Sequence, residues 1–142
     1  YADSEIEVCI QDDVKISHDS HALVVHSTSR PVHDTLMKLL LTIQMLKNKG
    51  ASIITAIIPY FGYGRQDVAT SGESVAHFVM RLLQEAGANR IITVELHNPD
   101  ILHNAPIEVV HIRLNRFIAD YIQEEEKPTE WTLIAPDRGA FN

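Results

Sequence analysis

The stretch of the sequence with the richest chemistry is residues 59–67, which spell Pro-Tyr-Phe-Gly-Tyr-Gly-Arg-Gln-Asp. Aromatic rings can stack on a purine, an arginine can bind phosphate through two hydrogen bonds, and a glutamine can bind a base edge or a phosphate. A buried aromatic cluster beside a surface arginine is the alternative interpretation. The sequence contains no P-loop motif and no three-glycine dinucleotide motif, so a nucleotide site here would belong to another class.

Two further polar residues follow predicted strands. His97 comes directly after residues 90–96, and Asp137 comes just after residues 131–135. By itself, His97 could bind a metal ion. Each residue also has an ordinary explanation. His97 could be a hydrogen-bonded residue at a strand end, and Asp137 could belong to a turn or a helix cap.

The elements that must position these residues alternate between strands and helices. We predict strands at residues 6–10, 22–26, 52–59, 90–96, 108–112 and 131–135, and helices from Pro31 onward, over 74–86 and over 114–123. This alternation indicates an α/β fold, with a mostly parallel sheet and helices on both faces. Ligands bind outside the carboxyl ends of such strands, which points to the loops after Pro59, Leu96 and Ala135. Residues 68–72 and 98–106 are expected to be flexible loops.

Composition excludes several classes of protein. The chain has 142 residues, 45% of them hydrophobic and 22% charged, which is typical of one folded globular domain. A net charge of −7 argues against nucleic acid as a partner, and the apolar stretches are too short to cross a membrane. The polar opening residues do not resemble a signal peptide, and the single cysteine, Cys9, suits a reducing compartment. We therefore expect a cytoplasmic protein.

Several segments resemble the ribose-phosphate pyrophosphokinase family. Residues 58–67 are similar, almost letter for letter, to the ATP-binding segment of that family, and residues 27–37 resemble its Ser-Thr-x-x-Pro-Val-Asn-Asp-x-Leu-Met helix start. Residues 3–6 resemble its Asp-Gly-Glu-Ile stretch. Residues 86–97 resemble the passage that ends in Asp-Leu-His, and residues 136–139 resemble the Ser-Pro-Asp-x-Gly turn. These matches follow the order of the family from one end of the chain to the other.

The resemblance implies a phosphoribosyltransferase-like fold and an activity. Residues 1–142 would form a single domain like the N-terminal, ATP-binding domain of the family, with residues 133–142 at the start of a C-terminal domain. The implied reaction transfers a diphosphate from ATP to ribose 5-phosphate and yields phosphoribosyl pyrophosphate and AMP. The catalytic lysine of the family would lie beyond residue 142.

The resemblance also assigns roles to individual residues. ATP binding would fall on Asp3, Ser4, Glu5, Arg65 and Gln66, and Mg²⁺ binding on His97 and Asp137. In the family, the acidic segment that matches residues 3–5 reaches into the adenine pocket of a neighbouring subunit. This implies a homo-oligomer whose ATP site is shared between subunits.

The chain departs from the family pattern at several positions. Residues 68–73 contain no lysine or arginine, whereas the family has a basic loop there. Glu95 stands where the family has aspartate, and Arg30 and His33 also differ from the usual residues. These differences motivate a second hypothesis, a non-catalytic family member that regulates an active partner. A third hypothesis, a phosphoribosyltransferase, is disfavoured because the Arg-Gln-Asp segment belongs to ATP binding.

Overall fold

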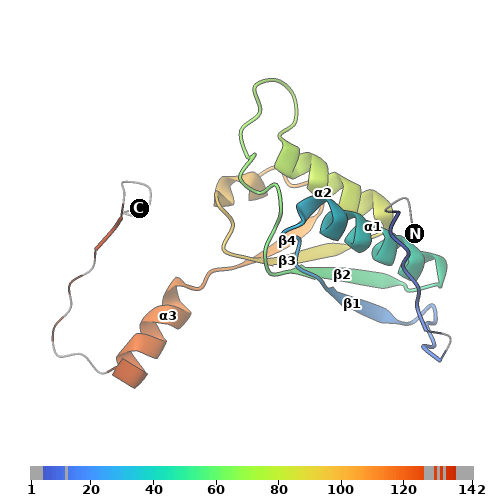
Figure 1. Ribbon diagram of the computed structural model, residues 1–142, viewed down its shortest axis with the longest axis horizontal. Coiled ribbons are helices and arrows are strands. Elements are labelled where there is room, and N and C mark those ends of the chain that lie inside the picture. Colours follow the sequence, from blue (N-terminus) through green and yellow to red (C-terminus); the bar gives the residue numbers. More distant parts are fainter. Residues whose placement is uncertain (1–4, 12, 127–129, 131, 133, 137–142) are drawn as a thin grey trace. The chain divides into compact units, whose positions relative to one another are not determined.

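The structure is a computed structural model that describes residues 5–11, 13–126, 130, 132 and 134–136 (Figure 1). The predicted site residues Asp3, Ser4 and Asp137 lie outside this described part. The chain divides into two compact units, residues 1–112 and residues 113–142.

The first unit is built on a parallel sheet. Its strands are β1 (His21–Val25), β2 (Ile53–Ile58), β3 (Arg90–Val94) and β4 (Glu108–Ile112). They lie side by side in the order β1-β2-β3-β4, and every neighbouring pair is parallel (Figure 1). The predicted α/β class is confirmed, and so are the strands that we expected within this unit from residue 22 onward. The carboxyl ends of all these strands meet at one edge of the sheet, where ligands bind in such folds.

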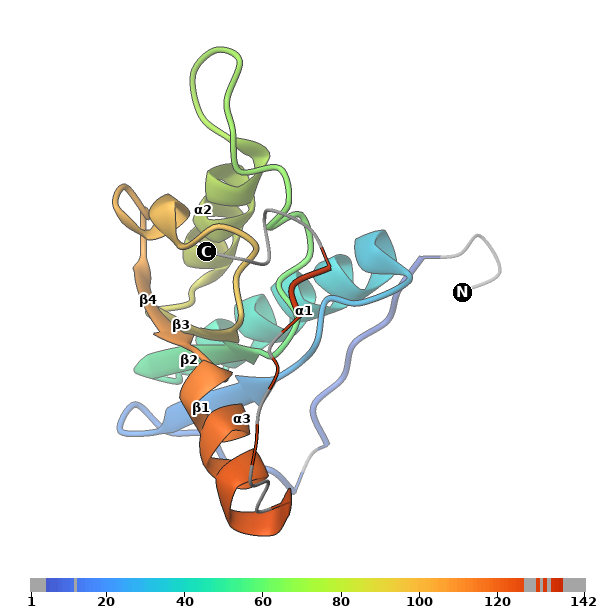
Figure 2. The ribbon, with the colours of Figure 1, turned by 90° about the vertical axis from the view of Figure 1, so that its left-hand side faces the viewer.

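Two long helices, α1 (Val32–Asn48) and α2 (Val75–Ala86), cover the same face of the sheet (Figures 1 and 2). We expected helices on both faces, but Leu23 and Val25 on the opposite face of β1 are exposed in this unit. Strands that are neighbours both in sequence and in space are joined by right-handed crossovers, which place every crossover helix on one face. The core lies between this face and the helices. Its fully buried members are Leu39 and Ile43 of α1, Met80 and Leu83 of α2, and Ile54, Ala56, Ile58 and Ile91 of the sheet.

The ends of α2 follow local rules. The hydroxyl of Ser74 accepts a hydrogen bond from the backbone N–H of His77 at 3.3 Å and so caps the first turn. At the other end Gly87 has a φ of 121°, which a residue with a side chain rarely adopts. A Cβ atom at this position would also lie 2.6 Å from Cδ of Lys47 in α1. The sequence-based helix boundaries are therefore confirmed to within a residue.

One strand predicted in this unit is wrong. Residues 6–10 form no strand; they run as an extended segment beside α1 (Figure 1). There Ile6 and Val8 line a shallow pocket with Leu41 and Met45. Alternating apolar residues bury one side equally well against a helix, so the pattern alone does not require a sheet partner. The segment at 98–106 joins β3 to β4 as predicted and contains a short 3-10 helix, η1 (Pro99–Leu102).

The second unit contains α3 (Asn115–Tyr121), which continues as a π-helical turn, η2 (Ile122–Glu126). The predicted helix at 114–123 is thus confirmed and extends into the acidic residues where we expected it to stop. Of the strand predicted at 131–135, Thr132, Ile134 and Ala135 are described and are not in a strand, and the other two residues lie outside the described part. Among the described helices, none has the length and apolar character that crossing a bilayer requires.

Candidate functional site

The loop after β2 curls back on itself. The backbone N–H of Gly64 donates to the carbonyl of Phe61 at 3.2 Å, and the N–H of Gln66 donates to the carbonyl of Tyr63 at 2.9 Å. Tyr63 adopts a φ of 64°, a left-handed conformation that costs free energy in a residue other than glycine and that is often found at functional sites. This turn leaves Arg65 and Gln66 exposed at the carboxyl edge of the sheet.

The loop after β3 is held by the neighbouring strand. Glu95, with a φ of 44°, donates its N–H to the carbonyl of Ile112 at 3.1 Å. The next N–H, that of Leu96, donates to Nε2 of His111 on β4 at 3.0 Å. Because Nε2 accepts this bond, the neutral His111 ring carries its proton on Nδ1. His97 follows directly and is exposed at the same edge as Arg65.

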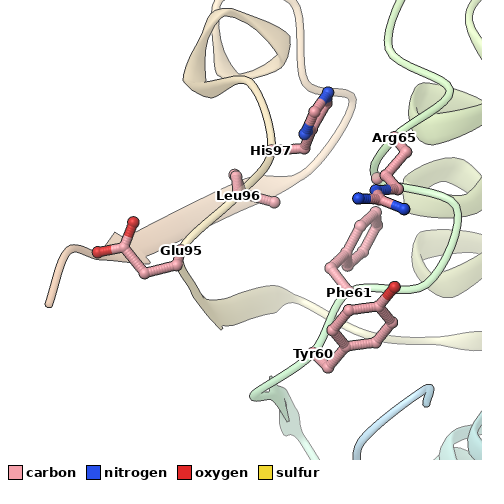
Figure 3. Close-up of a pocket in the computed structure, with 7 residues that line it drawn as sticks. Tyr60, Phe61, Arg65, Glu95, Leu96 and His97 are labelled. Atoms are coloured by element: carbon pink, nitrogen blue, oxygen red, sulfur yellow. The ribbon is translucent and has the colours of Figure 1, made fainter. Parts of the chain in front are cut away.

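A pocket of about 180 Å³ lies between these two loops. Its lining consists of Tyr60, Phe61, Gly64, Arg65, Glu95, Leu96 and His97. Figure 3 shows Arg65 and His97 on two sides of the opening, while the carboxylate of Glu95 points away from Arg65. A guanidinium and an imidazole at the mouth of so small a pocket suit an anionic group of the size of a phosphate.

A second pocket of about 480 Å³ adjoins the first and shares Tyr60 and Arg65 with it. Its lining consists of Pro31, Val32, His33, Tyr60, Tyr63, Arg65 and Gln66. The His33 ring and the Tyr63 hydroxyl share a hydrogen bond, and the two rings lie 6.0 Å apart at an angle of 41°. This volume falls within the range of about 300–1,000 Å³ that is typical of small-molecule sites. Aromatic faces with polar groups at one end suit a planar heterocycle.

A carboxylate and an amide connect the two loops beside the smaller pocket. The side-chain amide of Asn98 donates to the Asp67 carboxylate at 2.8 Å. This hydrogen bond is the main cause that lowers the pKa of Asp67; backbone hydrogen bonds and the nearby His97 lower it further, while burial opposes them. Asp67 is therefore ionised near His97. In the described part of the chain, no three His, Cys, Asp or Glu side chains gather as a metal site.

The structure brings together three of the predicted site residues, Arg65, Gln66 and His97, at the carboxyl edge of the sheet. Glu5 lines a different pocket, together with Ile6 and residues of α1. That pocket lacks Arg65 and shares His33 with the larger of the two pockets described above. The remaining predicted residues, Asp3, Ser4 and Asp137, lie outside the described residues, and their roles stay predictions.

The contribution of the segment after β1 was not predicted from the sequence. The loop after β1 supplies Pro31 to the larger pocket, and the first turn of α1 supplies Val32 and His33. Thr28 of the same loop is hydrogen-bonded to the loop after β2. The signal that could have found it was available, because ligands bind outside the carboxyl ends of parallel strands and β1 ends directly before this loop. The contribution of Glu95 to the smaller pocket was also missed.

Comparison with known proteins shows the family of this chain. The family model for the N-terminal domain of ribose phosphate pyrophosphokinase matches residues 1–87. The chain belongs to the ribose-phosphate pyrophosphokinase family. Ribose-phosphate pyrophosphokinase 1 of Listeria monocytogenes serovar 1/2a is 36% identical over 141 residues, which cover 98% of this chain and 43% of the relative. The ribose-phosphate pyrophosphokinase of Aquifex aeolicus is 37% identical over 141 residues, 98% of this chain and 44% of the relative.

A solved structure is also similar. The crystal structure of phosphoribosylpyrophosphate synthetase from Mycobacterium smegmatis has a TM-score of 0.78 and 35% sequence identity, over 88% of this chain and 42% of that one. This similarity confirms the predicted family and its phosphoribosyltransferase-like α/β fold. The chain spans less than half the length of the pyrophosphokinases that it matches.

Proposed function

We propose that the protein transfers a diphosphate from ATP to ribose 5-phosphate, and that this chain supplies the ATP-binding side of the site. The observation that carries the proposal is the pair of adjoining pockets at the carboxyl edge of the sheet, with Arg65 and Tyr60 in the lining of both. The names of the relatives support this transferase over the non-catalytic regulator and over a phosphoribosyltransferase.

The two pockets fit two parts of one nucleotide. The larger one offers the rings of Tyr60 and Tyr63 to the adenine, and the amide of Gln66 to a base edge. The smaller one offers Arg65 to the phosphates and His97 to a metal ion bound by them. Since Arg65 lines both, its guanidinium would bind where the nucleoside meets the triphosphate.

The reaction requires positioning and charge neutralisation more than covalent help from the protein. The anomeric hydroxyl oxygen of ribose 5-phosphate forms a bond to the β-phosphorus, and the bond from that phosphorus to the oxygen bridging it to the α-phosphate breaks. AMP leaves with the electron pair of the broken bond, and the hydroxyl proton passes to solvent. Arg65 would hold the triphosphate in line with the attacking oxygen and offset its negative charge.

The described residues fit a Mg²⁺ ion that the nucleotide brings with it. Mg²⁺ prefers oxygen ligands and binds through one or two protein groups plus substrate phosphates. His97 at the mouth of the smaller pocket, near the ionised Asp67, provides such a sparse environment. By family resemblance Asp137 would be the second ligand. The bound ion would neutralise part of the triphosphate charge.

The proposal includes a cytoplasmic homo-oligomer with an ATP site shared between subunits. Glu5 lines a pocket that lacks Arg65 and shares His33 with the larger pocket, and this location is compatible with an action on the nucleotide of a neighbouring chain. An adenine amino group is the natural target for such a carboxylate, because it donates hydrogen bonds.

The decisive experiment uses the full-length protein with ATP, ribose 5-phosphate and Mg²⁺, and follows AMP and phosphoribosyl pyrophosphate by chromatography. We expect equal amounts of both products, and no AMP when ribose replaces ribose 5-phosphate or when Mg²⁺ is chelated. Absence of AMP with every divalent metal tried would reject the transferase. AMP formation without the sugar phosphate would indicate hydrolysis instead.

A further inference from the structure

The hydroxyl of Thr28 connects the loop after β1 to the loop after β2. Thr28 is only 3% exposed, and its Oγ1 donates a hydrogen bond to the carbonyl of Tyr60 at 2.8 Å. The same oxygen accepts a hydrogen bond from the N–H of Gly62 at 2.6 Å. In addition, the backbone N–H of Thr28 donates to the Tyr60 carbonyl at 3.1 Å. One residue therefore holds the turn at both Tyr60 and Gly62.

The turn also lies directly on this residue. A Cβ atom at Gly62 would come within 2.8 Å of the Thr28 carbonyl oxygen and 3.0 Å of its Oγ1. It would also come within 2.9 Å of Cγ1 of Val32. Because the nearest of these atoms belongs to the backbone, it cannot move aside easily. The approach of the two loops is thus set by close packing as well as by hydrogen bonds.

We infer that Thr28 is a positioning residue for the nucleotide site. It lies outside the lining of both pockets and acts through the turn at Tyr60 and Gly62, which leads into Arg65. The role requires a group that donates and accepts at once, and a hydroxyl is the side-chain group of this size that does both. Serine keeps this capacity, whereas valine has the shape of threonine and lacks it. The inference rests on the proposed ATP site for its functional consequence.

Loss of the hydroxyl has a specific consequence for the loop. In Thr28→Val, the N–H of Gly62 stays buried and loses its acceptor, and the Tyr60 carbonyl keeps only the bond from the Thr28 N–H. A buried donor without an acceptor is costly enough to shift the turn toward open conformations. We expect ATP affinity to fall about tenfold, since the open turn no longer holds Tyr60 and Arg65 in place. Thr28→Ser should stay close to the wild type.

The test compares the full-length wild type with Thr28→Val, Thr28→Ser and the matched control Thr55→Val. Thr55 is also buried, at 2% exposure, and its hydroxyl bonds to Nε2 of His21 at 2.9 Å, away from both pockets. Three measurements are made on each protein: ATP affinity by calorimetry, thermal unfolding, and amide hydrogen exchange of peptides that cover residues 60–66. Both valine variants should lose thermal stability. Only Thr28→Val should lose exchange protection over 60–66 and ATP affinity.

The outcomes separate this inference from the proposed function. Unchanged protection over residues 60–66 in Thr28→Val, or a serine variant no better than valine, would overturn the positioning role. Suppose that the wild type binds no ATP, but that residues 60–66 exchange faster in Thr28→Val than in the wild type. This result would reject the proposed function and support the positioning role. If Thr28→Val does not fold, Thr28→Ala removes the same hydroxyl with less crowding and answers the same question.

Discussion

The side-chain amide of Asn98 donates a 2.8 Å hydrogen bond to the carboxylate of Asp67, which joins the loop after β3 to the loop after β2. Oδ1 of the same asparagine accepts a hydrogen bond from the N–H of Asp100 at 3.0 Å and so caps the start of η1. One side chain thus connects both loops that form the smaller pocket, and its hydrogen bond is the largest single cause of the lowered pKa of Asp67.

Replacement of Asn98 by alanine should raise the pKa of Asp67 toward its ordinary value, because the largest cause of the lowering is removed. The lowered pKa contributes stability that is fully present above the ordinary Asp pKa of about 3.9 and is lost as pH falls through the folded-state value. Between the ordinary pKa and the lower folded-state pKa, the variant should therefore lose less stability on acidification than the wild type loses. NMR titration of the Asp67 carboxyl carbon and urea unfolding across pH measure both effects. The exposed Asn104 on the same loop provides the control Asn104→Ala, and equal Asp67 titration in both variants would refute the assignment.

Arg65→Ala should weaken ATP binding by about one to two factors of ten, since a hydrogen bond to a charged group contributes about 1.5–3 kcal/mol. Ribose 5-phosphate binding should change less, because Arg65 lines the pockets assigned to the nucleotide. Calorimetric titration of the full-length protein with each ligand measures the difference. Arg81→Ala is a suitable control, because Arg81 lies on α2, forms an ion pair with Glu73 and lines neither pocket. ATP affinity that is the same in both variants would make Arg65 a surface residue.

His111→Phe should destabilise the protein by about 1–3 kcal/mol, because the N–H of buried Leu96 loses its acceptor. Chemical denaturation gives the free energy of unfolding directly. His103→Phe serves as the control, since the His103 side chain is 78% exposed and lies outside this contact. Equal stability of the His111 variant and the wild type would show that water or another group satisfies the Leu96 amide.

A shared ATP site predicts that two inactive variants restore each other. In an oligomer mixed from Glu5→Ala and Arg65→Ala chains, some interfaces pair an intact Glu5 with an intact Arg65 of the other chain. We therefore expect partial recovery of AMP formation after subunit exchange between the full-length variants.

The control for this experiment is subunit exchange itself, which differently labelled chains and native mass spectrometry can follow. Mixing Arg65→Ala chains with Gln66→Ala chains should restore less, because both residues line one pocket of the same chain. Proven exchange without recovery in the Glu5 and Arg65 mixture would place both residues in the site of one chain.

The sequence alone determined the elements of the sheet and the loop that carries Arg65. Periods of two and of 3.6 residues are local properties, so Ile54 and Ile58 on a strand or Leu39 and Ile43 on a helix can be assigned without knowledge of their partners. The rule that ligands bind at the carboxyl ends of parallel strands then placed Arg65 and His97 at one edge. The same local rule wrongly predicted a strand at residues 6–10, where Ile6 and Val8 of an alternating pattern pack beside α1.

Only the tertiary structure decided how the loops are held at that edge. Hydrogen bonds join Thr28 to Gly62, His33 to Tyr63 and Asn98 to Asp67, across sequence separations of 34, 30 and 31 residues. Each contact depends on which strands are neighbours in the sheet and on the angle at which each loop leaves its strand. A hydrogen bond forms only when donor and acceptor come within about 3 Å, and no periodic pattern in the chain encodes a distance of that kind between separate loops.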